Sequence, residues 1–108
     1  MNTIPYGRQS INDSDIASVV SALKGEFLTT GPLVDQFEER LQQFIGAPCT
    51  VVSSGTAALH CAYAAIDLKP GDEVITPPMT FIATQATAAL FGAKIVFADI
   101  QKDTGNIN

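Results

Sequence analysis

The sequence predicts an α/β protein with parallel strands, and two observations lead to this class. Residues 47–108 alternate short apolar runs with longer, alanine-rich stretches, in the order strand, helix, strand, helix, strand. Turn-forming residues such as Lys-Pro-Gly-Asp at 69–72 separate these segments. Strands that alternate with helices in this way form crossover units in a parallel sheet whose faces are covered by helices.

Residues 1–46 form the first predicted region, an extended arm over residues 1–10 followed by two amphipathic helices. Asn12 suits the cap of the first helix, Pro32 suits the first turn of the second, and Gly46 suits its end. Each helix carries one apolar stripe, formed by Ile16, Val19, Val20 and Leu23 in the first and by Val34, Phe37, Leu41 and Phe44 in the second. We therefore expect both helices to cover a larger body.

Residues 47–108 form the second predicted region, a β-α-β-α-β part of an incomplete domain. The expected strands are 49–53, 73–76 and 94–99, and the expected helices are 55–66 and 80–91. Both helices are apolar almost all round, which predicts burial on most sides. Three parallel strands are few for a sheet that needs cover on both faces. We therefore expect further parts of a larger domain to complete it.

The composition excludes several classes of protein. The chain has 108 residues, 46% hydrophobic and 16% charged, which favours a folded domain over disorder. Its net charge is −5 and its six basic residues are scattered, which argues against nucleic-acid binding. No apolar run approaches the roughly 20 residues that cross a bilayer, and the start lacks signal-peptide order. We therefore expect a cytoplasmic protein without membrane contact. Cys49 and Cys61 lack a metal-binding spacing, so we expect buried, reduced thiols and no metal site.

The turn formed by Ser54, Gly55 and Thr56 lies where a predicted strand becomes a helix. Unpaired N–H groups and the positive end of the helix dipole stabilise an anion there, phosphate above all. Gly55 lets the backbone come close to a ligand, and the two hydroxyls can add donors. The same residues could form an ordinary helix cap. The spacing matches neither the dinucleotide-binding nor the Walker motif. The residues alone therefore leave two interpretations of this turn open, a phosphate site and an ordinary helix cap.

Phe81 follows the second predicted strand, in the first turn of a predicted helix. A place in the core is the commoner fate of such a ring. The alternative is a flat platform on which a planar ring can stack. The residues alone favour the core.

Several motifs together resemble the DegT/StrS family of pyridoxal-phosphate-dependent sugar aminotransferases. They are SSGTAALH at 53–60, GDEVITPPMTFIAT at 71–84 and GAKIVFADI at 92–100, with further segments at 4–11, 27–38 and 103–107. The resemblance implies fold type I, shared with aspartate aminotransferase, with this chain as the N-terminal part of the large domain. It also implies pyridoxal phosphate as cofactor and a homodimer. The chain looks most like the branch that aminates a UDP-linked 4-keto-6-deoxy amino sugar on the way to pseudaminic acid, with glutamate the expected amino donor.

The resemblance also assigns roles to single residues. The implied cofactor-binding residues are Ser54, Gly55 and Thr56 around the phosphate, Phe81 stacked on the pyridine ring, and Thr84 near the same pocket. The implied substrate-facing residues are Tyr6, Thr29, Thr30 and Gly31. His60 matches a usual family position, where we expect a core histidine with a hydrogen-bond partner and no catalytic role.

No catalytic residue can be assigned in this chain. The family's cofactor-binding lysine, and the aspartate that pairs with the pyridinium nitrogen, come later in the sequence than Asn108. The lysines present match no part of that motif; they are Lys24, Lys69, Lys94 and Lys102. We therefore expect the 108-residue chain to be inactive by itself.

Three alternatives to a sugar aminotransferase stay open. One is a pyridoxal-phosphate-dependent sugar dehydratase of the same family, in which the lysine position differs. Another is a truncated, non-enzymatic fragment that associates through its exposed apolar surface. The third is a small stand-alone phosphate-binding domain, against which the strongly apolar helices argue.

Overall fold

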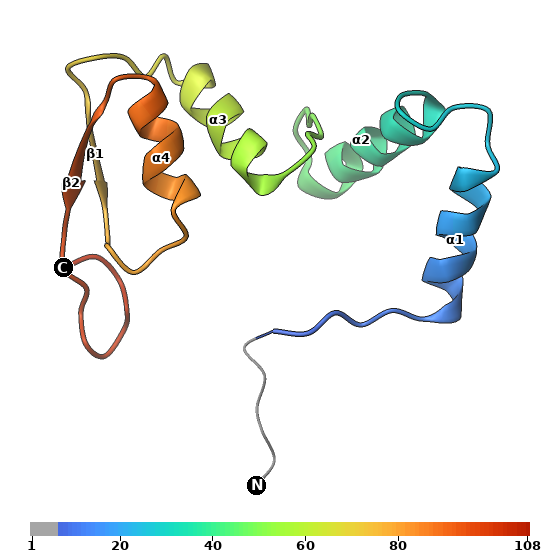
Figure 1. Cartoon of the computed structure of the whole chain (residues 1–108), viewed down its shortest axis with the longest axis horizontal. Helices are drawn as coiled ribbons and strands as arrows, with labels where there is room; N and C mark the ends of the chain where they lie inside the picture. Colours follow the sequence, from blue (N-terminus) through green and yellow to red (C-terminus); the bar gives the residue numbers. More distant parts are fainter. Residues whose placement is uncertain (1–6) are drawn as a thin grey trace, which may run out of the picture. The chain divides into compact units, whose positions relative to one another are not determined.

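A computed structural model describes residues 7–108, which divide into two compact units between Thr50 and Val51 (Figure 1). The first unit holds two helices, and the second holds two helices and a two-stranded parallel sheet. Over the described residues, no helix is both long and apolar enough to cross a bilayer. Each unit is built from local signals that the sequence carries.

Helix α1, Asp13–Leu23, begins at the predicted cap. The Asn12 side chain accepts hydrogen bonds from the N–H groups of Ser14 at 2.8 Å and Asp15 at 3.1 Å. The Asp15 carboxylate accepts from the N–H of Asn12 at 2.9 Å, which completes a reciprocal capping box. Both acidic residues of the first turn also lie at the positive end of the helix dipole.

Helix α2, Pro32–Ile45, has the predicted start and end. Gly31 precedes it with φ 119°, and an added Cβ would lie 2.7 Å from the Cβ of Phe27. Gly46 ends the helix in the left-handed conformation, at φ 78°. Glycine is therefore needed at Gly31 for both its backbone angle and its close contact.

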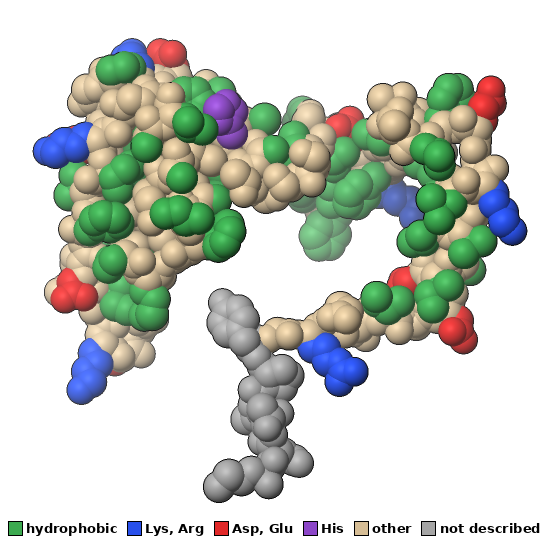
Figure 2. Space-filling model, viewed as in Figure 1, with side chains coloured by type: hydrophobic (Ala, Val, Ile, Leu, Met, Phe, Trp, Pro, Cys, Tyr) green, Lys and Arg blue, Asp and Glu red, His purple; other side chains and the backbone are tan. Residues whose placement is uncertain are grey.

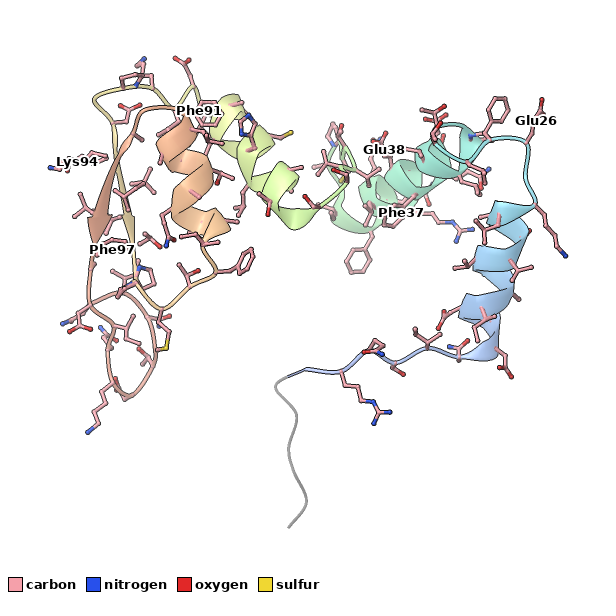
Figure 3. The ribbon with its side chains drawn as sticks, viewed as in Figure 1. Glu26, Phe37, Glu38, Phe91, Lys94 and Phe97 are labelled. Carbon is pink, nitrogen blue, oxygen red and sulfur yellow. The ribbon has the colours of Figure 1, made fainter. Side chains whose placement is uncertain are left out.

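The apolar stripes of α1 and α2 are exposed within the described chain. Neither helix has a buried residue, and Leu23 is 65% exposed. Figure 2 shows apolar side chains gathered along both helices, and Phe37 of α2, labelled in Figure 3, is 54% exposed. The stripes themselves are as predicted, and among residues 7–108 nothing buries them.

The sheet of the second unit pairs β1, Glu73–Thr76, with β2, Lys94–Phe97. The strands are parallel, with Glu73 opposite Lys94 and Thr76 opposite Phe97. Helix α4, Ala83–Leu90, joins them as the crossover and packs on the sheet. The buried residues are small: Ala83, Ala88, Ala93, Thr76 and Thr87.

Two predicted elements differ from the structure by more than two residues. Residues 49–53 are not a strand, because a strand needs a hydrogen-bonded neighbour and the sheet of residues 7–108 consists of β1 and β2. The helix predicted over 80–91 begins only at Ala83. Pro77 and Pro78 supply no N–H to a helix, and the chain turns through residues 78–82 before the helix starts.

Helix α3, Gly55–Ala65, packs beside α4 but has no buried residue. The prediction that it is buried on most sides is therefore wrong for this chain, because α4 covers only part of its apolar surface. Cys61, on this helix, is exposed and Cys49 is half-buried, so the expectation of two buried thiols is also wrong. Both cysteines are free thiols.

Candidate functional site

The turn before α3 combines a helix cap with free backbone donors. Ser54 is extended, with φ −163° and ψ 162°, and its Oγ accepts a hydrogen bond from the N–H of Ala57 at 3.1 Å. Gly55 and Thr56 are the first two residues of the helix, so their N–H groups have no carbonyl partner within it. The two interpretations of this turn are therefore compatible: the Ser54 side chain caps the helix, and the backbone beyond it is left with donors for an anion.

Within residues 7–108, Gly55 has no steric or conformational reason to be glycine. An added Cβ would meet nothing within 4 Å, and its φ lies outside the left-handed range. By contrast, Gly31 is required by both criteria. A glycine that leaves open space at a helix start fits a phosphate that approaches the backbone closely.

The charge pattern at the helix starts supports the same site. The first turn of α1 contains Asp13 and Asp15, and that of α2 contains Asp35. The first turns of α3 and α4 contain no acidic residue. The positive ends of these two helices are therefore not neutralised by their own carboxylates and can stabilise a bound anion.

Phe81 lies outside the core. It precedes the first residue of α4 by two positions, and 73% of its surface is exposed. The core position that the residues alone favoured is therefore wrong. An exposed ring held beside the start of a helix suits the platform interpretation, because one face of a planar ligand could stack on it.

The starts of α3 and α4 are directed to one side of the second unit. Figure 1 shows both helices running against the direction of β1 and β2, so their first turns point toward the edge where the strands end. In parallel α/β sheets this is the edge where ligands bind. The two helices also contact each other. The Ser54-Gly55-Thr56 turn and Phe81 thus belong to one unit, and the helices that they precede start on the same side of it.

Thr84 lies in the first turn of α4 and is half-buried. Its hydroxyl lies 3.0 Å from that of Thr80, and its N–H donates to the carbonyl of Phe81 at 3.0 Å. Thr80 was not predicted as a site residue. The four-residue spacing of the two threonines could have indicated the pair, since i and i+4 positions face each other across a helical turn.

His60 is exposed, so the expected core position is wrong. Its ring packs against that of Phe91 with centroids 4.8 Å apart and planes tilted by 41°. Tyr63, one turn later on α3, donates a hydrogen bond to the carbonyl of Thr84 at 3.1 Å. Sequence reasoning missed Tyr63, because a contact between residues 21 positions apart leaves no local signal.

The predicted substrate-facing residues lie elsewhere in the chain. Thr29, Thr30 and Gly31 form the loop before α2 in the first unit. Thr30 lines a hollow of about 200 Å³ whose other walls are apolar, including Leu23 and Leu33. Tyr6 lies outside the described residues. The structure thus places the loop of Thr29, Thr30 and Gly31 in the first unit. The residues predicted to bind the cofactor all lie in the second unit.

Comparison with known proteins gives consistent results. Residues 9–108 match the DegT/DnrJ/EryC1/StrS aminotransferase family. A UDP-4-amino-4,6-dideoxy-N-acetyl-beta-L-altrosamine transaminase from Campylobacter jejuni is 47% identical over 106 residues, which are 97% of this chain and 28% of that protein. The chain therefore spans little more than a quarter of that curated relative.

Solved structures show the same fold. A protein described as a sugar aminotransferase, Spr1654 from Streptococcus pneumoniae in its PLP form, matches with a TM-score of 0.85 and 37% identity over 99% of this chain and 28% of its own. Helicobacter pylori PseC, an aminotransferase of pseudaminic acid biosynthesis, matches with a TM-score of 0.84 and 34% identity, over 96% of this chain and 29% of its own. The predicted fold class, the N-terminal part of a fold-type I domain, is confirmed.

Proposed function

Because the chain belongs to the DegT/DnrJ/EryC1/StrS aminotransferase family, we propose that it is the amino-terminal part of a pyridoxal-phosphate-dependent sugar aminotransferase. The observation that carries this proposal is the open cradle at Gly55, with free N–H donors and no acidic residue in its helical turn. Neither packing nor backbone geometry among the described residues explains this glycine, whereas a bound phosphate group would.

In this proposal the second unit holds the cofactor. The N–H groups of Gly55 and Thr56 and the Thr56 hydroxyl bind the phosphate, while Ser54 caps the helix that presents them. Phe81 supports one face of the pyridine ring. Bound pyridoxal phosphate would supply the electron sink for transferring an amino group. We propose that the lysine and aspartate that serve this chemistry belong to parts of the enzyme outside residues 1–108.

The proposed substrates are an amino-acid donor, glutamate, and a nucleotide-linked 4-keto-6-deoxy sugar. The donor's amino group would replace the keto oxygen of the sugar, and glutamate would leave as 2-oxoglutarate. The 47% identity to a UDP-sugar transaminase and the likeness to an enzyme of pseudaminic acid biosynthesis support a UDP-sugar of that pathway. We assign Tyr6, Thr29, Thr30 and Gly31 to the substrate side.

Product analysis with the full-length protein that carries this chain tests the proposal. We expect one aminated sugar nucleotide and one 2-oxoglutarate for each glutamate consumed, measured by mass spectrometry. The 108-residue chain alone should give no product. A dehydratase would instead yield a sugar that has lost a hydroxyl group and gained no amine. Turnover by the short chain would show that it contains a catalytic group that we have not assigned.

We further propose that the full-length protein is a homodimer in which the stripes of α1 and α2 are buried. Leu23 of α1 is 65% exposed in the described chain, and covering such apolar surface is favourable. Leu23→Asp should therefore shift the protein from dimer to monomer in sedimentation velocity. Ser18→Asp, on the polar side of the same helix, is the matched control and should leave the dimer intact. A dimer that persists in Leu23→Asp would place this stripe outside the interface.

A cytoplasmic location is also part of the proposal. Cys49 and Cys61 are free thiols, a state that the reducing cytoplasm maintains. Cell fractionation tests this point, and recovery of the protein outside the cytoplasm would contradict it.

A further inference from the structure

The start of α4 is not held by a conventional cap. Ile82 occupies the cap position with φ −53° and ψ −28°, and no side chain accepts a hydrogen bond from the first turn there. The preceding Pro77 and Pro78 have no N–H to contribute. Other contacts must therefore fix the turn that presents Phe81.

Thr84 supplies these contacts through three of its groups. Its N–H donates to the carbonyl of Phe81 at 3.0 Å, and its hydroxyl shares a hydrogen bond with that of Thr80 at 3.0 Å. Its carbonyl accepts a hydrogen bond from the hydroxyl of Tyr63 at 3.1 Å. Thr84 is therefore the junction between Phe81, on one side, and α3, on the other.

The Tyr63 hydrogen bond is an additional tether and not a requirement of helix α4. Within an α-helix the carbonyl of residue 84 already pairs with the N–H of residue 88. Removing the phenol hydroxyl would therefore leave no unpaired backbone group in α4. The phenol is half-buried and comes from α3, the helix that Ser54 caps and Gly55 begins. Its hydroxyl thus links the phosphate-binding helix to the turn that carries the stacking ring.

We propose that Tyr63 is a positioning residue of the cofactor site, which acts through Thr84 to hold Phe81 at a fixed place relative to the Ser54-Gly55-Thr56 turn. This inference rests on the proposed function. The proposed cofactor is held at its phosphate by the start of α3 and at its ring by the start of α4. The two helix starts must therefore keep a constant separation. A shift of Phe81 would weaken its stacking on the cofactor even though the phenyl ring is still present. It would also change the orientation of the bound pyridine ring.

The test compares Tyr63→Phe with Thr87→Val in the full-length protein, with pyridoxal phosphate as the ligand. Tyr63→Phe should raise the dissociation constant of pyridoxal phosphate about three- to tenfold, the effect of one hydrogen bond. It should also change the visible circular dichroism of the bound cofactor, which reports ring orientation. Thr87→Val is the matched control, because its buried hydroxyl donates to the helix's own Ala83 carbonyl, at 2.6 Å, and not to α3. It should leave both cofactor measurements unchanged.

Each other outcome overturns the proposal in a recognisable way. Unchanged affinity and dichroism in Tyr63→Phe, with affinity lost in Phe81→Ala, would remove Tyr63 from the site and leave the proposed function standing. Equal effects of Thr87→Val would mean that α4 is weakened in general. If the unaltered protein binds no pyridoxal phosphate, both the inference and the proposed function fail. Should Tyr63→Phe not fold, Tyr63→Met removes the same hydroxyl and keeps an apolar side chain, and unchanged dichroism there would overturn the proposal.

Discussion

Replacing Gly55 by alanine should raise the dissociation constant of pyridoxal phosphate about ten- to a hundredfold while leaving the fold intact. The new methyl group would occupy the space that lies open beside Gly55 and would hold the phosphate away from the backbone donors. Losing charge-assisted hydrogen bonds of this kind accounts for an effect of that size. The fold should be unharmed, because alanine fits this backbone and favours a helix more than glycine does.

Cofactor affinity and the thermal midpoint of the cofactor-free protein, measured together, check this result. Gly7→Ala is the matched control, because an added Cβ there also meets nothing within 4 Å and its φ is not left-handed. It should leave cofactor affinity unchanged. If Gly55→Ala binds pyridoxal phosphate as well as the unaltered protein does, the turn before α3 is only a helix cap.

Phe81→Ala should weaken cofactor binding by about 20- to 100-fold. The change removes the stacked ring and the apolar area that it would cover, which together account for this range. Stability of the cofactor-free protein should change little, because 73% of Phe81 is exposed. Equilibrium dialysis against pyridoxal phosphate, with a thermal melt of the same sample, measures both effects.

Two further substitutions separate stacking from general contact around Phe81. Met79 belongs to the same turn and is 76% exposed, so Met79→Ala should leave cofactor affinity within about twofold. Phe81→Tyr keeps the ring and should retain the cofactor. A large loss of stability in Phe81→Ala with unchanged affinity would return Phe81 to a packing role.

The elements that the sequence predicts most closely are those that local chemistry defines. Pro32 and Gly46 mark α2, and Asn12 marks the start of α1, because caps act within one turn of the backbone. The strand at 73–76 is likewise confirmed to its ends. These signals need no partner from elsewhere in the protein.

The predictions that fail depend on distant partners. Residues 49–53 carry β-branched side chains but become a strand only beside another strand. The burial expected for α3, His60 and Cys61 requires surfaces that α4 alone does not provide. In the candidate site, the Ser54-Gly55-Thr56 turn and Phe81 were predicted from motifs. The Tyr63–Thr84 contact was not, because it depends on how two helices pack.

The small core of the second unit has a consequence for how such a protein is made. Alanine and threonine side chains bury little area, so the unit gains little free energy from its own packing. The 106 matched residues make up 28% of the Campylobacter relative. In a protein of that length, about 270 residues would still be untranslated, which takes roughly 15–50 s at ordinary synthesis rates. Throughout that interval the apolar helices of the nascent chain would be open to chaperones and to aggregation.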